Sequence, residues 1–587
     1  MKLWRIGLLG WWVFVSLTAF GLVEEQSSSL DHSSRDASYK AAKDTSKPVH
    51  QDAKGGIFVR HFVIEGVTEF NVASLESLLS DLTHRSLSFG ELQEAANRIT
   101  RYYHVRGYLV ARAYLPVQAV SNGTVRIVVL EAHLGTLQLT NHSLLRDSVA
   151  YRYFSPHGTT LYGPALERQM LLLTDAAGVS LRPNTPYIDA TLQPGASVGL
   201  SDLVMELLPR KRVTGVVYAD TYGDKFTGIP RLGASLMLNS PLGVGDQLSI
   251  QGQNSFDGRR LKNCIVGNNF RSCINGTGAF KHVWNGLTYW LASYKIPVPG
   301  TGLGFGASYQ QSHYQLARQF LLLGAHGNAN IGSVYGSYAF VRSNRYNVLG
   351  IAAYDNKQLK DVLAVFSSFN RRRINLGRMG LVFSYYPTIT SGLQFTLSYF
   401  LGDLKFQNPL FASIDSLTVR TQGGYQKLAG LGSIYWRLGS SFLLLFSGQG
   451  QISNKNLDSS EKFVLGGPYA VRAYAQSTAQ GDEGYVGSAE LRYLWSRQLF
   501  GVIPYISGFF DGGKVWFNHT PFNPPVLVGP FVLKNTLTLM GAGCGLGVES
   551  GVRNIKASIQ VAWKVNARNI PGDNRDPIVW FQVVKTF

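Results

Sequence analysis

One arginine in the stretch "GGPYAVRAYAQ", residues 466–476, has an unusual setting for a charged side chain. Arg472 lies among small and apolar neighbours and has no carboxylate within three positions. The planar fork of a guanidinium forms strong hydrogen bonds when it meets a carboxylate in a bidentate pair. The setting therefore favours an ion pair with a distant partner, and the alternative is a solvated loop arginine.

Two cysteines form the second candidate for chemistry. Cys264 and Cys273 lie close together in a polar segment rich in Asn and Gly. In an exported chain we expect a disulfide that closes one loop, and the alternative is two free thiols. No histidine accompanies them at zinc-ligand spacing, and no nucleophile–base pair or phosphate-binding loop is present. We expect no catalytic residues, no metal, no cofactor and no enzymatic activity.

The composition indicates a membrane β-barrel. Only 16% of the 587 residues are charged, while aromatic residues reach 12% and glycine occurs 63 times. No stretch beyond the N-terminus offers 18 uncharged apolar residues, so no spanning helix is expected. Alternating lipid-facing and lumen-facing residues would give the neutral mean hydropathy of the chain.

The net charge of +19 raises the question of an anionic partner. Lysines and arginines are spread along the chain, and the one tight run, residues 371–373, opens a strand next to a loop. No recognition helix or stacking aromatic motif supports nucleic-acid binding. We expect the cations to meet anionic lipopolysaccharide or to line a lumen.

The first 56 residues have the composition of a leader and a linker. Lys2 and Arg5 precede an apolar run over 6–23 that ends in small residues, so we expect a signal peptide at 1–21. An uncleaved anchor is the alternative. The polar segment 22–56 reads as a linker, with one candidate plug helix at 32–44.

Two small α/β modules follow, at 57–133 and 134–209. In the first we expect strands at 57–65, 108–116 and 123–131 and helices at 72–80 and 88–107, the second helix opened by a capping box of Ser88 and Glu91. In the second we expect strands at 134–140, 187–195 and 202–209 and a helix at 165–178. Such a fold leaves a sheet edge that can accept an extended peptide, and the alternative is a plain spacer.

From residue 210 to 587 the hydrophobic period is two. The segments 231–239, 247–253, 488–495 and 555–564 each place apolar residues on one face and polar residues on the other. We expect about 16 strands of roughly ten residues in an antiparallel transmembrane barrel. Short links alternate with long ones, which are expected at 257–277, 314–330, 354–372, 402–422, 453–484, 512–532 and 565–576. The longest of them, 453–484, contains Arg472 and is the sixth on the extracellular side.

Several of these segments resemble the TpsB family, the outer-membrane transporters of two-partner secretion. The segment "GYLVARAYLPVQAVSNGTVRIVVLEAHLG" is similar to the first POTRA domain of that family. In the family, the sixth loop folds into the lumen with a Val-Arg-Gly-Tyr/Phe motif. Residues Val471, Arg472, Ala473 and Tyr474 match three of its four positions, with Ala473 in place of the glycine.

The resemblance also supplies the partner of the arginine. The family pairs it with an aspartate of a Phe-x-Asp-x-Gly motif on the barrel wall, which Phe509, Asp511 and Gly513 match. Glu490, on an inward polar face, is expected beside that pair. The terminal Phe587 is similar to the signal that the barrel-assembly machinery reads.

The implied fold is mainly β: a 16-stranded antiparallel transmembrane barrel preceded by two small α/β POTRA domains. The implied protein is a monomer in the outer membrane of a Gram-negative bacterium, with its POTRA domains in the periplasm. Its expected partners are a secreted, TpsA-like exoprotein cargo, outer-membrane lipid and lipopolysaccharide, and the barrel-assembly machinery. The alternative in the same superfamily is a barrel-insertion factor, which usually has more POTRA domains. A passive porin or a barrel enzyme is a third reading, but a porin would not need the periplasmic modules.

Overall fold

The computed structural model describes residues 56–180, 190–256, 286–316, 323–522, 534–550, 554–566 and 575–587. The chain divides into two compact units, with the boundary between Arg210 and Lys211. The predicted signal peptide, the candidate plug helix, and Cys264 and Cys273 lie outside the described residues. In the described part of the chain, no helix has the length and apolar character needed to cross a membrane.

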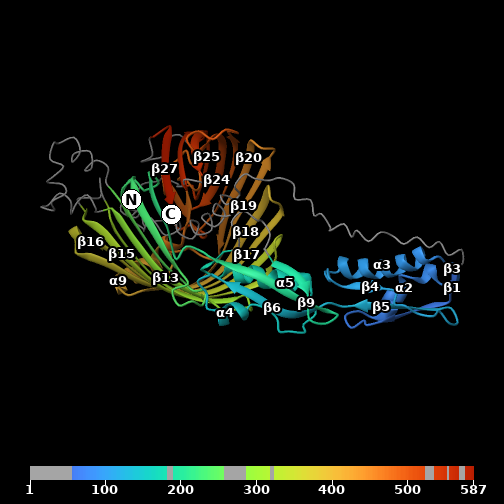
Figure 1. Cartoon of the computed structure of the whole chain (residues 1–587). Coiled ribbons are helices and arrows are strands. Elements are labelled where there is room, and N and C mark those ends of the chain that lie inside the picture. Colours follow the sequence, from blue (N-terminus) through green and yellow to red (C-terminus); the bar gives the residue numbers. More distant parts are fainter. Residues whose placement is uncertain are drawn as a thin grey trace. The chain divides into compact units, whose positions relative to one another are not determined.

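The first α/β module packs two helices on a small sheet. Its elements are β1 (Ile57–Val59), β2 (His61–Glu65), α2 (Val72–Ser77), the short 3-10 helix η2 (Ser80–Leu82), β3 (Arg85–Leu87), α3 (Phe89–Val105), β4 (Arg112–Tyr114) and β5 (Thr124–Leu130). The sheet order is β2–β5–β4, and β1 pairs with β3. The predicted capping box is confirmed: Ser88 and Glu91 each bond the other's backbone N–H at the start of α3. Helix α3 lies along the sheet (Figure 1) and buries its apolar stripe, which includes Ile99 and Tyr103.

The second module has a four-stranded sheet. Its elements are β6 (His133–Asn141), α4 (Asp147–Tyr151), α5 (Gly163–Asp175), β7 (Val179–Ser180), β8 (Ala190–Pro194) and β9 (Leu200–Pro209). Strand β9 pairs in parallel with β6 and antiparallel with β7 and β8. The short elements β3, β7 and α4 were not predicted, because two to five residues carry too little hydrophobic period to be recognised.

A buried carboxylate, Glu131, accepts several hydrogen bonds at the end of the first module. Glu131 is 5% exposed and accepts hydrogen bonds from the backbone of Thr68 and Glu69 and, at 2.6 Å, from the hydroxyl of Tyr103. Burial disfavours the charged form of Glu131, but these hydrogen bonds outweigh burial and lower its pKa. Glu69 in turn accepts from Tyr108 of the first module and from Thr160 of the second, so the two modules share polar contacts.

Sixteen antiparallel strands form a closed barrel in which β10 pairs with β27, which confirms the predicted strand number. Figure 1 shows the strands of this barrel side by side. The strands are β10 (Val213–Asp220), β11 (Arg231–Asn239), β12 (Gln247–Ser255), β13 (Leu287–Pro297), β14 (Leu303–Gln315), β15 (Ala325–Arg342), β16 (Tyr346–Leu363), β17 (Ser368–Thr388), β18 (Ser391–Phe406), β19 (Gly423–Leu438), β20 (Phe442–Ser453), β23 (Glu483–Leu494), β24 (Ile503–Trp516), β25 (Thr536–Ser550), β26 (Ile555–Lys564) and β27 (Ile578–Thr586).

The alternation sorts the side chains onto two faces of the wall. In β11, Leu232 and Leu236 are exposed, whereas Arg231 and Asn239 are buried. The apolar face is therefore the outer face of the barrel, and the polar face points into the lumen.

The prediction of a long loop at 354–372 is wrong. Strands β16 and β17 run through this segment for 18 and 21 residues and are joined only by residues 364–367, which include the 3-10 helix η4 (Ala364–Phe366). The prediction failed because both faces of the strands are polar there: Lys357 and Arg372 point into the lumen, while Lys360 and Arg371 point outward. Without an apolar face, a strand has the composition of a loop.

Candidate functional site

The connection between β20 and β23, residues 454–482, folds back on itself. It contains the 3-10 helix η5 (Ser459–Glu461) and the short strands β21 (Phe463–Leu465) and β22 (Ala479–Gly481), which pair antiparallel. Gly466 and Gly467 follow β21 with φ of +97° and +114°, a backbone conformation that favours glycine. These two residues turn the chain so that Arg472 lies at the far end of the folded loop.

Arg472 meets Asp511 of β24 in a bidentate pair. Its Nε donates to Oδ2 at 2.9 Å, its Nη2 donates to Oδ1 at 2.8 Å, and its backbone N–H donates to Oδ2 at 3.0 Å. The remaining guanidinium nitrogen, Nη1, donates to Oε2 of Glu490 at 2.6 Å, and Nη2 also donates to the hydroxyl of Ser488 at 2.9 Å. We call Arg472, Asp511, Glu490 and Ser488 the tip cluster.

Strand register explains why these wall residues converge. Ser488 of β23 is paired directly with Asp511 of β24, and Glu490 is paired with Phe509. All four occupy alternate positions on the same face of the sheet. Asp511 is fully buried and Arg472 is 6% exposed, so the loop covers the polar face of these two strands.

Two aromatic residues complete the surroundings of the guanidinium. The Cζ atom of Arg472 lies 3.4 Å from the ring centroid of Phe509, a stacking contact between two planar groups. The indole Nε1 of Trp580 in β27 donates to the backbone carbonyl of Arg472 at 2.7 Å. Sequence reasoning missed Ser488 and Trp580, because neither belongs to a motif and only the barrel register brings them near.

The other motif residues pack the loop against the wall. Val471, Ala473 and Tyr474 are fully buried, in one apolar cluster with Phe463 of β21 and Val515 of β24. The close approach of loop and wall depends on glycine. A Cβ added at Gly513 would lie 2.7 Å from a methyl of Leu465, and one added at Gly541 would lie 2.4 Å from the Cβ of Ala473.

Gly541 leaves room for alanine at the glycine position of the family motif. The methyl group of Ala473, which a glycine would lack, lies where Gly541 of β25 has no side chain.

A second group of ion pairs holds the start of the loop. The carboxylate of Glu461 forms ion pairs with Nζ of Lys357 at 2.7 Å and with Nζ of Lys427 at 2.9 Å. Asp458 pairs with Arg372, whose guanidinium also pairs with Asp361. We call Asp458, Glu461, Lys357, Arg372, Lys427 and Asp361 the base cluster. Its members other than Asp361 are less than 9% exposed, and sequence reasoning missed all of it.

Glu461 stays ionised in this setting. Burial disfavours its charged form, but the ammonium groups of Lys357 and Lys427 outweigh burial and lower the pKa of Glu461 to about 2. The signal that could have revealed the base cluster is the presence of two carboxylates, Asp458 and Glu461, near the start of a long loop. A sequence alone does not say which of many lysines and arginines they meet.

The two clusters lie on different parts of the wall. The base cluster uses β16, β17 and β19, which are the seventh, eighth and tenth strands of the barrel, whereas the tip cluster uses β23 and β24, with Trp580 on the sixteenth strand, β27. Strand β20 lies between these two groups of strands, and its Gln449 and Gln451 donate to backbone carbonyls of Tyr469 and Glu461 in the loop. The loop therefore lies inside the barrel along several strands of the wall and is fastened at both ends of its path.

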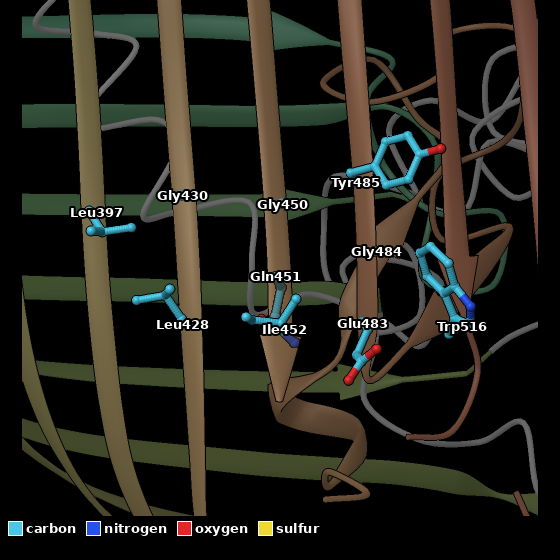
Figure 2. Close-up of a pocket in the computed structure, with 10 residues that line it drawn as sticks. All are labelled: Leu397, Leu428, Gly430, Gly450, Gln451, Ile452, Glu483, Gly484, Tyr485 and Trp516. Atoms are coloured by element: carbon cyan, nitrogen blue, oxygen red, sulfur yellow. The ribbon is translucent and has the colours of Figure 1, made fainter. Parts of the chain in front are cut away.

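A cavity of about 400 Å³ lies against strands β18, β19, β20, β23 and β24. Figure 2 shows the apolar side chains of Leu397, Leu428 and Ile452 on neighbouring strands beside this cavity. Tyr485, which also lines it, is 54% exposed and lies between buried neighbours, so it belongs to the outward series of β23. The cavity is a feature of the outer face and is separate from the tip cluster.

The two clusters can hold the loop 454–482 in place through ion pairs. Paired charges and stacked planar groups hold a loop in one place and release it when a partner is lost. Within the described ranges, no group of three His, Cys, Asp or Glu side chains is arranged to hold a metal ion.

Comparison with known families identifies both units. Residues 199–546 match the family model described as haemolysin secretion/activation protein ShlB/FhaC/HecB. Residues 57–132 match the model of the ShlB-type POTRA domain.

Full-length relatives are similar over most of the chain. The haem/haemopexin transporter protein HuxB of Haemophilus influenzae strain 86-028NP is 26% identical over 528 residues, covering 87% of this chain and 84% of HuxB. The outer membrane transporter CdiB of Escherichia coli O6:K15:H31 is 24% identical over 546 residues, covering 90% of this chain and 84% of CdiB. The solved structure of CdiB from Escherichia coli superposes with a TM-score of 0.71 over 98% of each chain at 19% identity, which shows a shared fold.

Proposed function

Because this chain belongs to the ShlB/FhaC/HecB family of haemolysin secretion/activation proteins, which are transporters of two-partner secretion, we propose that it captures an unfolded exoprotein in the periplasm and secretes it through its barrel. The observation that carries the proposal is the loop 454–482, which lies inside a closed barrel and is fastened there by ion pairs. Ion pairs can break and form again without a change in the barrel wall. Such contacts suit a conduit that must stay closed until cargo arrives, whereas a permanent plug does not need them.

The α/β modules are the proposed site of capture. The first is a POTRA domain of the ShlB type, and we propose that the second, at 134–209, is also a POTRA domain. In the first module, β2 and β4 are the outer strands of the sheet and can accept an extended segment as a further strand. An exoprotein that folds only after leaving the cell would bias its own passage outward.

The remaining partners follow from an outer-membrane location. We propose that the protein is a monomer without catalytic activity, that its outer face contacts lipid and lipopolysaccharide, and that Phe587 is read by the barrel-assembly machinery. Phe587 exchanges backbone hydrogen bonds with Gly215 of β10, and its ring fills the space that a Cβ at Gly215 would need. HuxB is named as a haem/haemopexin transporter protein, and an exoprotein of haem acquisition is one candidate cargo here.

The test is a secretion assay with a candidate exoprotein whose gene lies next to the gene of this chain. We expect the full chain to release it into the medium and the variant lacking residues 57–133 to assemble a heat-modifiable barrel that releases none. Normal secretion by the deletion variant would contradict the capture role. A loss of other outer-membrane proteins, with secretion unaffected, would favour an insertion factor.

A further inference from the structure

Four cations lie on the outer face of the barrel, on three neighbouring strands. They are Lys360 of β16, Arg371 and Arg373 of β17, and Lys405 of β18. Their outward direction follows from alternation, because Arg372 lies between two of them and is buried in the base cluster, and Leu404 beside Lys405 is fully buried. We call these four residues the cation patch.

Strand register places like charges directly opposite each other. Lys360 is paired with Arg371 across β16 and β17, and Arg373 is paired with Lys405 across β17 and β18. Like charges in such positions destabilise a sheet. Asp403 approaches Lys405 at 3.4 Å, and no ion pair joins Lys360, Arg371 or Arg373 to a carboxylate of the described residues. The barrel therefore keeps a repulsive arrangement on a face where neutral side chains would suffice.

On the side of the patch away from the connection 364–367, the outer face of the same three strands becomes apolar. Beyond the polar Gln358 and Asn375, its exposed side chains include Tyr354, Met379 and Leu401, which are 50%, 65% and 45% exposed. Leu401 and Lys405 are four residues apart, roughly 13 Å along an extended strand. An apolar band followed by cations at this spacing matches the change from acyl chains to charged headgroups at a membrane surface.

The connection 364–367 lies at the same end of the barrel as the loop 454–482, because both follow odd-numbered strands, the seventh and the eleventh. The patch beside this connection therefore faces the leaflet on the side where the long loops emerge. With the outer-membrane location of the proposed function, on which this inference rests, that leaflet is the outer one, whose glycolipids carry phosphate groups.

We propose that Lys360, Arg371, Arg373 and Lys405 bind the phosphate groups of an anionic glycolipid of the outer leaflet, with diphosphoryl lipid A as the recognised headgroup. The phosphates relieve the repulsion between the paired cations. The apolar side chains below the patch contact the acyl chains of the same lipid. Arginine is suited to this role because its fork forms two parallel hydrogen bonds to one phosphate.

The test measures lipid binding by the purified, detergent-solubilised full chain in native mass spectrometry. The variant carries Lys360→Gln, Arg371→Gln and Arg373→Gln, and the matched control carries Lys295→Gln, Arg345→Gln and Arg497→Gln at the opposite end of the barrel. Because each cation near an anionic lipid surface contributes, we expect the variant to bind diphosphoryl lipid A roughly tenfold or more weakly and the control to bind it like the wild type. If the triple variant does not assemble a heat-modifiable barrel, Arg371→Gln alone should still weaken binding several-fold.

The outcomes separate this inference from the proposed function. Equal binding of diphosphoryl lipid A by the wild type and the variant would overturn the inference, as would equally strong binding of phosphatidylglycerol or full displacement by inorganic phosphate. Binding that weakens from diphosphoryl to monophosphoryl lipid A would support it. Secretion and membrane fractionation test the proposed function instead, and their failure leaves the binding measurement in detergent unchanged.

Discussion

At the scale of single residues, Arg472 donates five hydrogen bonds to Asp511, Glu490 and Ser488. Removing one partner of a buried ion pair leaves the other uncompensated, which costs about 3–5 kcal/mol. We expect Arg472→Ala and Asp511→Ala each to impair secretion of the cargo while the barrel still assembles, as judged by heat-modifiability. Arg472→Lys should rescue poorly, because an ammonium cannot form two parallel hydrogen bonds.

A double variant tests whether the pair acts as a unit. If it does, Arg472→Ala combined with Asp511→Ala should be no worse than either single change. Additive defects, or normal secretion by Arg472→Ala, would indicate that the arginine acts independently of the aspartate.

The contact between Ala473 and Gly541 supports a second prediction at this scale. In Gly541→Ala the new Cβ would lie 2.4 Å from the Cβ of Ala473, so the loop must shift. We expect Gly541→Ala to loosen the loop 454–482, measured by hydrogen exchange, and the added change Ala473→Gly to restore its protection. Gly508→Ala on the outer face of β24, where a Cβ meets nothing within 4 Å, is the control. Failure of Ala473→Gly to compensate would show that the two residues are not coupled.

At the scale of elements, the base cluster determines where the loop begins its path through the barrel. In Glu461→Gln the ammonium groups of Lys357 and Lys427 remain buried without their shared carboxylate. We expect the start of the loop to lose protection from hydrogen exchange by roughly a hundredfold to several thousandfold, since breaking a buried pair costs about 3–5 kcal/mol. Adding Lys427→Met should recover part of this protection by removing one of the two buried charges. Unchanged protection in Glu461→Gln would contradict this role.

The first POTRA domain has an acid-sensitive element of its own. The pKa of Glu131 is lowered in the folded domain, so its contribution to stability is present above the unfolded pKa of about 4.3 and is lost as the pH falls through the folded value. We expect hydrogen exchange in residues 57–132 of the full chain to increase as the pH falls below about 4.3, after correction for the intrinsic pH dependence of exchange. Glu131→Gln should be less stable at neutral pH and should show a weaker pH dependence. An identical pH profile in both proteins would exclude Glu131 as the source.

At the scale of the whole barrel, the tip and base clusters share no residue and use different strands. Effects of changes at separate sites without shared partners add. We expect the double variant Arg472→Ala and Glu461→Gln to conduct ions across planar bilayers more than either single variant, because the loop is then free to leave the lumen. Conductance of the double variant equal to that of Arg472→Ala would show that the base cluster does not hold the loop inside.

Much of this architecture could be predicted because it depends on local patterns. The period of two in segments such as 231–239 and 555–564 predicted strands whose bounds the structure confirms, and a spacing of three residues predicted the cap made by Ser88 and Glu91. Composition predicted a membrane barrel, since alternation combines high aromatic content with neutral hydropathy, and the alternating segments with their links predicted about 16 strands. The resemblance to a family named Arg472 and Asp511 as partners.

The tertiary structure decided what local patterns cannot contain. Ser488, Trp580 and Gly541 lie far from Arg472 in sequence, and only the register of a closed barrel places them beside the loop. Lys357, Arg372 and Lys427 are ordinary cations in the sequence until a loop that lies inside the barrel brings Asp458 and Glu461 to them. The strands at 354–372 were mistaken for a loop for the same reason. A side chain's environment depends on the face, the depth and the neighbouring strand, and sequence spacing records only which residues share a face.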